Sequence, residues 1–257
     1  MQPAPKTPSL DQLRDTIARL ERGSTHPNAP TPLPFGLSSI DAALPGGGLP
    51  LAAVHEIAGT GADVEHGAAA ALFAAGILAR IPGPVLWVLE RQDLFAPGLA
   101  AAGLDPDRVI YAEAGRRDAL LVMEEGLRHR GLAGVAAELS GRVTLSASRR
   151  LQLAAEATGV TGLLLRRPAK GEAELAGAVA AVTRWRIGAL PSPPPIPDAP
   201  EVPGLGRARW RLDLVRCRGG RTGSWITEAC DASGRLGLVA PLADRPAAPD
   251  HAGRAAA

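Results

Sequence analysis

The stretch best suited to chemistry is the glycine-containing segment EIAGTGADVEHGAAAALFAAG, residues 56–76. A short apolar run, Val54–Ile57, leads into a glycine loop, and an alanine-rich run with helical character follows it. This order of strand, loop and helix is that of a phosphate-binding loop, with the pattern G-x-x-x-x-G-K-[ST]. In such a loop the backbone N–H groups and the helix N-terminus hold phosphate, while the lysine neutralises its charge.

The side chains of this loop reverse that charge. On the pattern, Gly59 takes the first glycine and Val64 the second, while Glu65 replaces the lysine and His66 the Ser/Thr. Losing one attraction and gaining one repulsion costs two terms of about 4 kcal/mol at 4 Å, even at a high effective dielectric. The attraction of the helix dipole for phosphate offsets only about 0.3–1 kcal/mol of this cost. We therefore predict a degenerate phosphate loop without ordinary ATP binding, made of Gly59, Thr60, Gly61, Ala62, Asp63, Val64, Glu65 and His66.

Two further carboxylates follow apolar runs that read as buried strands. Glu90 comes after VLWVL, and Glu138 lies near the end of GVAAEL. The carboxyl ends of parallel strands are where doubly wound folds place their sites. One interpretation is a residual nucleotide site in which both residues bind Mg²⁺ with an altered nucleotide pose. The favoured one is that they are retained polar groups paired with Arg91, Arg116 or Arg117.

The pattern of the whole chain predicts an α/β fold with a doubly wound, mostly parallel sheet. After Thr183 the pattern changes to period-two runs joined by glycine-rich turns, which predicts an antiparallel C-terminal extension on the sheet's edge. The expected strands are 54–57, 85–89, 109–111, 134–139 and 162–165, with helices at 38–44, 65–80, 97–103, 118–130, 146–158 and 172–180. In helix 118–130 the residues expected to face inward are Leu120, Leu121, Met123 and Leu127.

The ends of the chain differ from this body. Residues 1–34 are expected to form an N-terminal helix (Ser9–Arg22) and a proline-rich linker, residues 35–240 the α/β domain, and residues 241–257 a disordered tail. No apolar run is long enough to span a bilayer, and the N-terminus lacks the order of a signal peptide. With only two cysteines, this predicts a cytoplasmic protein. The scattered histidines predict no metal site.

Three longer phrases resemble one bacterial family. They are FGLSSIDAALPGGG, VLWVLERQDLFAPGLAAAGLDPDRVIYAEA and SASRRLQLAAEATGVTGLLLRRP, and the resemblance covers roughly residues 33–240. They resemble ImuA, a family of RecA-like, SulA-related accessory proteins of induced mutagenesis. The resemblance implies a RecA-like fold, induction in the SOS response to DNA damage, and a role in error-prone translesion synthesis. It also places Glu90 at RecA's catalytic glutamate and Glu138 at the Walker B aspartate.

The same resemblance implies partners. ImuA proteins work with ImuB, a Y-family-polymerase-like protein without catalytic activity, and with an error-prone C-family polymerase complex. RecA protomers add an N-terminal helix to a neighbour, so Ser9–Arg22 is expected to dock on RecA or on another copy. The main hypothesis is a non-catalytic adaptor without cofactor; the alternative is a DNA-stimulated ATPase that uses Glu90 and Glu138. A third idea, an inhibitor of cell division like SulA, rests on relatedness alone.

Charge distribution raises the question of DNA. The net charge is +2, but residues 142–221 carry 14 basic and 6 acidic groups. Such a region marks either a nucleic-acid face or a solvated surface. Arg207, Arg209 and Arg211 are expected on one face of an edge strand, and Trp185 and Trp210 in the core. The residues predicted for sequence-independent DNA contact are Arg142, Arg166, Arg167, Lys170, Arg184, Arg186, Arg207, Arg209 and Arg211.

Overall fold

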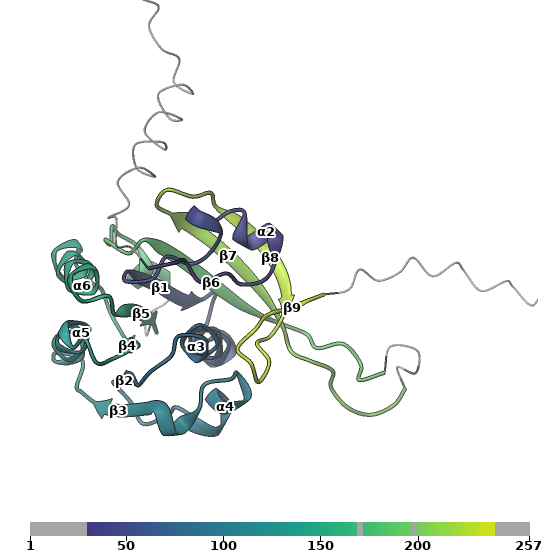
Figure 1. Cartoon of the computed structure of the whole chain (residues 1–257). Helices are drawn as coiled ribbons and strands as arrows, with labels where there is room; N and C mark the ends of the chain where they lie inside the picture. Colours follow the sequence, from purple (N-terminus) through teal and green to yellow (C-terminus); the bar gives the residue numbers. More distant parts are fainter. Residues whose placement is uncertain (1–29, 169–171, 197–198, 200, 240–257) are drawn as a thin grey trace, which may run out of the picture.

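The computed structural model describes residues 30–168, 172–196, 199 and 201–239 (Figure 1). Within them one sheet has the strand order β3-β2-β4-β5-β1-β6-β7-β8-β9. Strands β1 to β6 pair in parallel, and β7, β8 and β9 continue the sheet antiparallel. The predicted α/β fold, with its antiparallel C-terminal extension, is confirmed. The strands are β1 Val54–Gly59, β2 Val85–Leu89, β3 Val109–Glu113, β4 Gly134–Leu139, β5 Thr161–Arg166, β6 Thr183–Leu190, β7 Arg209–Cys217, β8 Gly223–Glu228 and β9 Gly237–Leu238.

Helices cover the two faces of the sheet differently. α5 and α6 pack side by side on one face, and α3 lies on the other with α4 beside it (Figure 1). The described helices are α2 Ser38–Asp41, α3 Asp63–Ala79, α4 Ala96–Ala101, α5 Ala119–Arg128 and α6 Leu145–Thr158, with 3-10 turns at η1 Pro45–Gly47, η2 Pro106–Arg108 and η3 Glu172–Leu175. Two hydrophobic cores result, one on each face of the sheet.

The core under α3 combines small helix residues with large rings from other elements. Ala74, Ala75 and Gly76 are buried, so the helix backbone comes close to its neighbours. A Cβ on Gly76 would lie only 2.3 Å from the sulfur of Cys230. The Trp185 ring centroid lies 5.5 Å from that of Phe73, within the range of favourable aromatic pairs. Trp185 and Trp210 are both buried, as predicted.

Three expectations about single elements were wrong. Residues 172–180 form only the turn η3, because Gly177 has a φ of +112°, which no α-helix accommodates. Leu121 is 57% exposed, because Ala119, Met123 and Leu127, spaced four residues apart, form the buried face of α5.

The third error concerns β7, which was expected at an edge. It begins at Arg209 and lies between β6 and β8, so the sheet ends instead at β3 and β9. Arg207 therefore precedes the strand.

Some predictions fall outside the described residues. They are the helix Ser9–Arg22, most of the linker after it, Lys170, and the tail 241–257. Within the described part, the helices are all too short or too polar to cross a membrane.

Replacing Trp185 by alanine tests the core under α3. Loss of a fully buried ring that contacts Phe35, Phe73 and Trp225 should lower the free energy of unfolding by about 3–5 kcal/mol. Urea denaturation of both proteins measures this difference. Leu121→Ala is the control, and its exposed position should limit the change to about 0.5 kcal/mol. Equal effects of the two substitutions would contradict this packing.

Candidate functional site

The segment predicted to be a degenerate phosphate loop is short in the structure. β1 ends at Gly59 and α3 begins at Asp63, so only residues 60–62 connect them. The helix therefore includes Asp63 and Val64, which belong to the loop in the phosphate-binding pattern. Ala62 stands at the N-cap and gives no side-chain hydrogen bond to the helix. The Thr60 N–H donates to the carbonyl of Ile187 at 3.1 Å, which ties the loop to β6.

His66 packs against the glycines of this loop. A Cβ on Gly59 would lie 2.7 Å from the His66 Cβ, and one on Gly61 would lie 3.2 Å from the imidazole ring. The Ala189 N–H donates to His66 Nδ1 at 3.1 Å, so the ring carries its proton on Nε2 when neutral. That nitrogen lies 3.5 Å from the Glu65 carboxylate. A histidine side chain thus covers the glycine surface that a phosphate would approach.

Beside the loop, one guanidinium joins three carboxylates. Arg167 directly follows β5, and its nitrogens lie 2.8 Å from Asp63, 2.6 Å from Asp93 and 2.6 Å from Glu138. These partners come from the start of α3, from the loop after β2 and from β4. We call Arg167, Asp63, Asp93 and Glu138 the arginine cluster. It connects three segments at the carboxyl ends of parallel strands, where this fold class places its ligands.

The electrostatics of the cluster agree with its geometry. Burial alone would lower the pKa of Arg167, but hydrogen bonds to Asp93 and Asp63 and the nearby Glu138 outweigh burial and raise that pKa. The hydrogen bond from Arg167 lowers the pKa of Asp93. Burial raises the pKa of Glu138, against the opposing effect of the Trp87 indole N–H at 2.9 Å and of Arg167. The guanidinium is therefore a permanent internal counter-charge.

The two carboxylates predicted for a residual nucleotide site lie close to this cluster. Glu138 belongs to it, and its ion pair is with Arg167 rather than with Arg91, Arg116 or Arg117. Glu90 accepts a hydrogen bond from the Ser140 hydroxyl at 2.6 Å. Its other oxygen, Oε1, is buried and has no hydrogen-bond partner in the described structure.

Very little space remains around these carboxylates. The hollow between Glu90, Glu138 and Arg167 is too tight for a water molecule. In this arrangement the side chains around Glu90 and Glu138 leave no room for a further group between them.

A second ion cluster lies on the opposite face of the sheet. Glu56 in β1 is fully buried and lies 3.4 Å from Arg166, 2.9 Å from Arg184 and 3.3 Å from Arg186. Burial lowers the pKa of Arg166, and Glu56 opposes that effect. All three arginines had been predicted to contact DNA. The structure gathers them around a buried glutamate.

The remaining predicted DNA contacts are dispersed. Arg207 pairs with Glu228 at 2.8 Å, and Arg211 with Asp213 at 3.1 Å. Arg142 is exposed and Arg209 half-buried, and neither forms an ion pair with a described residue. The nine predicted residues thus do not form one surface of free charge, and DNA contact stays a prediction.

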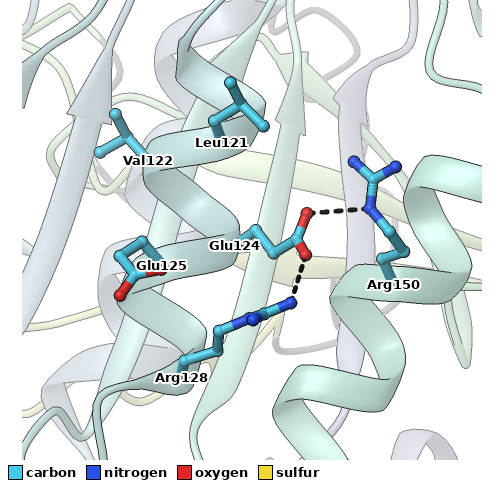
Figure 2. A pocket seen from close by; sticks show the side chains of 6 residues that line it. All are labelled: Leu121, Val122, Glu124, Glu125, Arg128 and Arg150. Atoms are coloured by element: carbon cyan, nitrogen blue, oxygen red, sulfur yellow. Dashed lines mark hydrogen bonds and ion pairs between the residues drawn. The ribbon is translucent and has the colours of Figure 1, made fainter.

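A hollow on the described surface lies between α5 and α6 (Figure 2). It measures about 610 Å³ and is lined by Leu121, Val122, Glu124, Glu125, Arg128 and Arg150. Glu124 points toward both arginines, with one oxygen 2.7 Å from Arg128 and the other 3.0 Å from Arg150. Both carboxylate oxygens of Glu124 are therefore paired with arginines of the hollow itself.

Sequence reasoning missed the role of three residues. Asp93 had not been singled out, although it closely follows a parallel strand. Glu56 carried a clear signal, a lone acid inside an apolar strand, which needs a buried cation. Arg167 had been assigned to DNA instead of to the site, because nothing in the chain order shows where its side chain points.

Comparisons with known proteins agree with this architecture. No protein-family model matches the chain. The chain is 44% identical over 239 residues to Protein ImuA of Caulobacter vibrioides, in strain NA1000 and in strain CB 15. Each alignment covers 88% of this chain and 96% of the relative. The crystal structure of the RadB recombinase is similar in fold, with a TM-score of 0.55, 16% identity, and coverage of 81% of this chain and all of that one.

Arg167→Met tests the arginine cluster. Glu138 is buried, and the substitution leaves its carboxylate without its ion-pair partner, whereas Asp63 and Asp93 keep their contacts to Arg91. The free energy of unfolding should therefore fall by about 1–3 kcal/mol. Denaturant unfolding measures the loss, and the control is Arg142→Met, which removes an exposed arginine that forms no ion pair with a described residue. Adding Glu138→Gln to Arg167→Met should recover part of the loss. A loss no larger than that of the control would show that the cluster does not stabilise the fold.

Proposed function

The chain belongs to the ImuA family, and on this premise we propose that it is a non-catalytic RecA-like adaptor of the DNA damage response. In this role it would support error-prone translesion synthesis and mutagenesis in the cytoplasm, as an accessory protein of the SOS response. Its proposed partners are an ImuB-type inactive Y-family polymerase homologue and an error-prone C-family polymerase complex. The support is the family membership, together with a phosphate loop whose chemistry is degenerate.

The observation that carries the non-catalytic part is the arginine cluster. Arg167 supplies to Asp63, Asp93 and Glu138 the positive charge that a bound metal ion would otherwise bring. A nucleotide triphosphate would have to enter beside carboxylates that the cluster only partly neutralises, and it would meet Glu65 as well. These ion pairs hold the start of α3, the loop after β2 and the end of β4 together without a nucleotide, which suits an adaptor.

Contact with DNA is a subsidiary part of the proposal. Arg142 and Arg209 form no ion pair with a described residue, so they retain charge for phosphate contacts. Contacts of this kind are independent of sequence and weaken with salt. Docking of Ser9–Arg22 on RecA or on a second copy also remains a proposal.

One observation favours the alternative, a DNA-stimulated ATPase. Glu90 Oε1 is a buried acceptor without a hydrogen-bond partner among the described residues. A ligand bound beside the degenerate phosphate loop would gain a hydrogen bond by donating to this oxygen. The adaptor proposal requires that this oxygen contribute nothing to nucleotide binding.

Thermal melting with and without millimolar Mg-ATP separates the two functions. We expect no shift for the natural chain, since Glu65 repels phosphate and His66 covers the loop. Glu65→Lys with His66→Thr restores the lysine and the hydroxyl of the motif, although Val64 still replaces its second glycine, and at a ligand concentration ten times Kd should raise Tm by about 2–5 °C. Adding Arg167→Gln to this double variant tests whether the arginine cluster still limits the access of Mg-ATP to the loop. A shift in the natural chain that Glu90→Ala abolishes would establish the ATPase instead.

A further inference from the structure

The connection between β6 and β7 is unusually long and rich in proline. Leu190 at the end of β6 is paired with Arg209 at the start of β7, so a short turn could join the two strands. They are joined instead by residues 191–208, PSPPPIPDAPEVPGLGRA. Loops longer than about 12–15 residues without their own secondary structure are uncommon, and often functional. Figure 1 shows this segment projecting away from the sheet. We call residues 191–208 the proline arm.

The arm has its own internal order. The Gly206 N–H donates to the carbonyl of Pro193 at 2.8 Å, which closes its base. A Cβ on Gly206 would lie 3.0 Å from Pro193, and one on Gly204 would lie 3.2 Å from Pro195, so the two limbs touch where the glycines leave room. Among the described residues, the hydrogen bonds of 191–206 run within the arm. Proline also restricts the backbone, so little conformational entropy remains to be lost on binding.

The arm exposes aliphatic side chains that the fold does not use. Leu205 is 82% exposed, Ile196 47% and Val202 37%, and none belongs to either core. A loop that served only to block strand addition would need prolines or charges, but not three exposed aliphatic residues. Several exposed aliphatic side chains on a segment that projects from the fold indicate a contact with another protein.

The charged residues of the proline arm indicate which kind of partner it can bind. The proline arm contains Asp198 and Glu201, and its one basic residue, Arg207, lies at its base and pairs with Glu228 of β8 at 2.8 Å. An acidic arm is repelled by nucleic acid and by anionic lipid, whereas it suits a protein groove with basic residues at its rim. Proline-rich segments with exposed aliphatic residues are recognised in grooves lined by aromatic side chains.

We propose that the proline arm is the segment by which this chain docks into an aromatic-lined, basic-rimmed groove of its protein partner. The arm inserts Leu205 and Ile196 into the groove, and Glu201 faces the basic rim. This inference rests on the proposed function, because it assigns a surface to the adaptor's contact with the ImuB-type protein.

The test is isothermal titration of the full-length chain with the purified ImuB-type protein. The arm variant Ile196→Ser/Leu205→Ser should raise Kd by about tenfold or more, because anchor residues carry most of an interface's affinity. The control is Ile226→Ser/Leu238→Ser, which removes two similarly exposed aliphatic residues from β8 and β9 and should change Kd less than about twofold. Tm should be the same in all three proteins, since every replaced side chain is exposed.

A second variant, Glu201→Arg, tests the basic rim. It should weaken binding at low salt, and the difference from the natural chain should shrink as salt rises.

Two outcomes would overturn the proposal for different reasons. If the natural chain binds the ImuB-type protein and the arm variant binds equally well, the arm is not the docking segment, although the adaptor function stands. If the natural chain does not bind at all, the proposed partnership itself is wrong. Sedimentation velocity covers the remaining case: loss of a dimer in the arm variant would mean that the arm joins two copies of this chain instead.

Discussion

Ion pairs, most of them to the guanidinium of Arg167, hold together the start of α3, the loop after β2 and the end of β4 at the carboxyl edge of the sheet. Arg91 adds longer contacts, 3.4 Å to Asp63 and 3.7 Å to Asp93. Asp63, Asp93 and Glu138 lie on different segments and would repel one another without a shared cation. Arg167 supplies that cation from inside the chain. In an NTPase of this fold class, metal and nucleotide bring charge to this region reversibly. In this chain an arginine side chain brings positive charge to the same region.

Arg166 and Arg167 act on opposite faces of the sheet. Successive residues of an extended segment point to opposite sides, so one side chain reaches Glu56 and the next reaches Glu138. The end of β5 is thus anchored on both faces through buried charges. Such pairs contribute little net stability over apolar packing, but breaking one of them is costly. They therefore specify where the strand ends and how the following segment leaves the sheet.

The antiparallel extension has one part that belongs to the core and one part that projects into solvent. β6 and β7 direct Trp185, Trp210, Leu212 and Leu214 toward α3, which completes the core that the parallel strands begin. The proline arm leaves from the far ends of these two strands and adds nothing to that core. A rigid hairpin that carries an exposed loop is a common way to present a binding segment.

Local patterns determined the fold class. Apolar runs of four to six residues separated by helical periodicity require a parallel sheet between helices, and alternation in TRWRI and RARWRLDL requires strands with one buried face. The strand, glycine loop and helix of residues 54–79 could also be predicted, because this order depends on consecutive residues. The degenerate phosphate chemistry of the loop stays a prediction. Residues 172–180 resisted prediction, since the positive φ of Gly177 and the burial of Val179 are set by contacts with distant elements.

The site was decided only by the tertiary structure. Arg167 lies 104 residues from Asp63, 74 from Asp93 and 29 from Glu138, and no periodicity links them. An arginine after a strand has the same local signal whether it faces DNA, solvent or a buried carboxylate. The strand order brings β5 next to β4 and β1, and that neighbourhood, not the local sequence, gives the guanidinium its three partners.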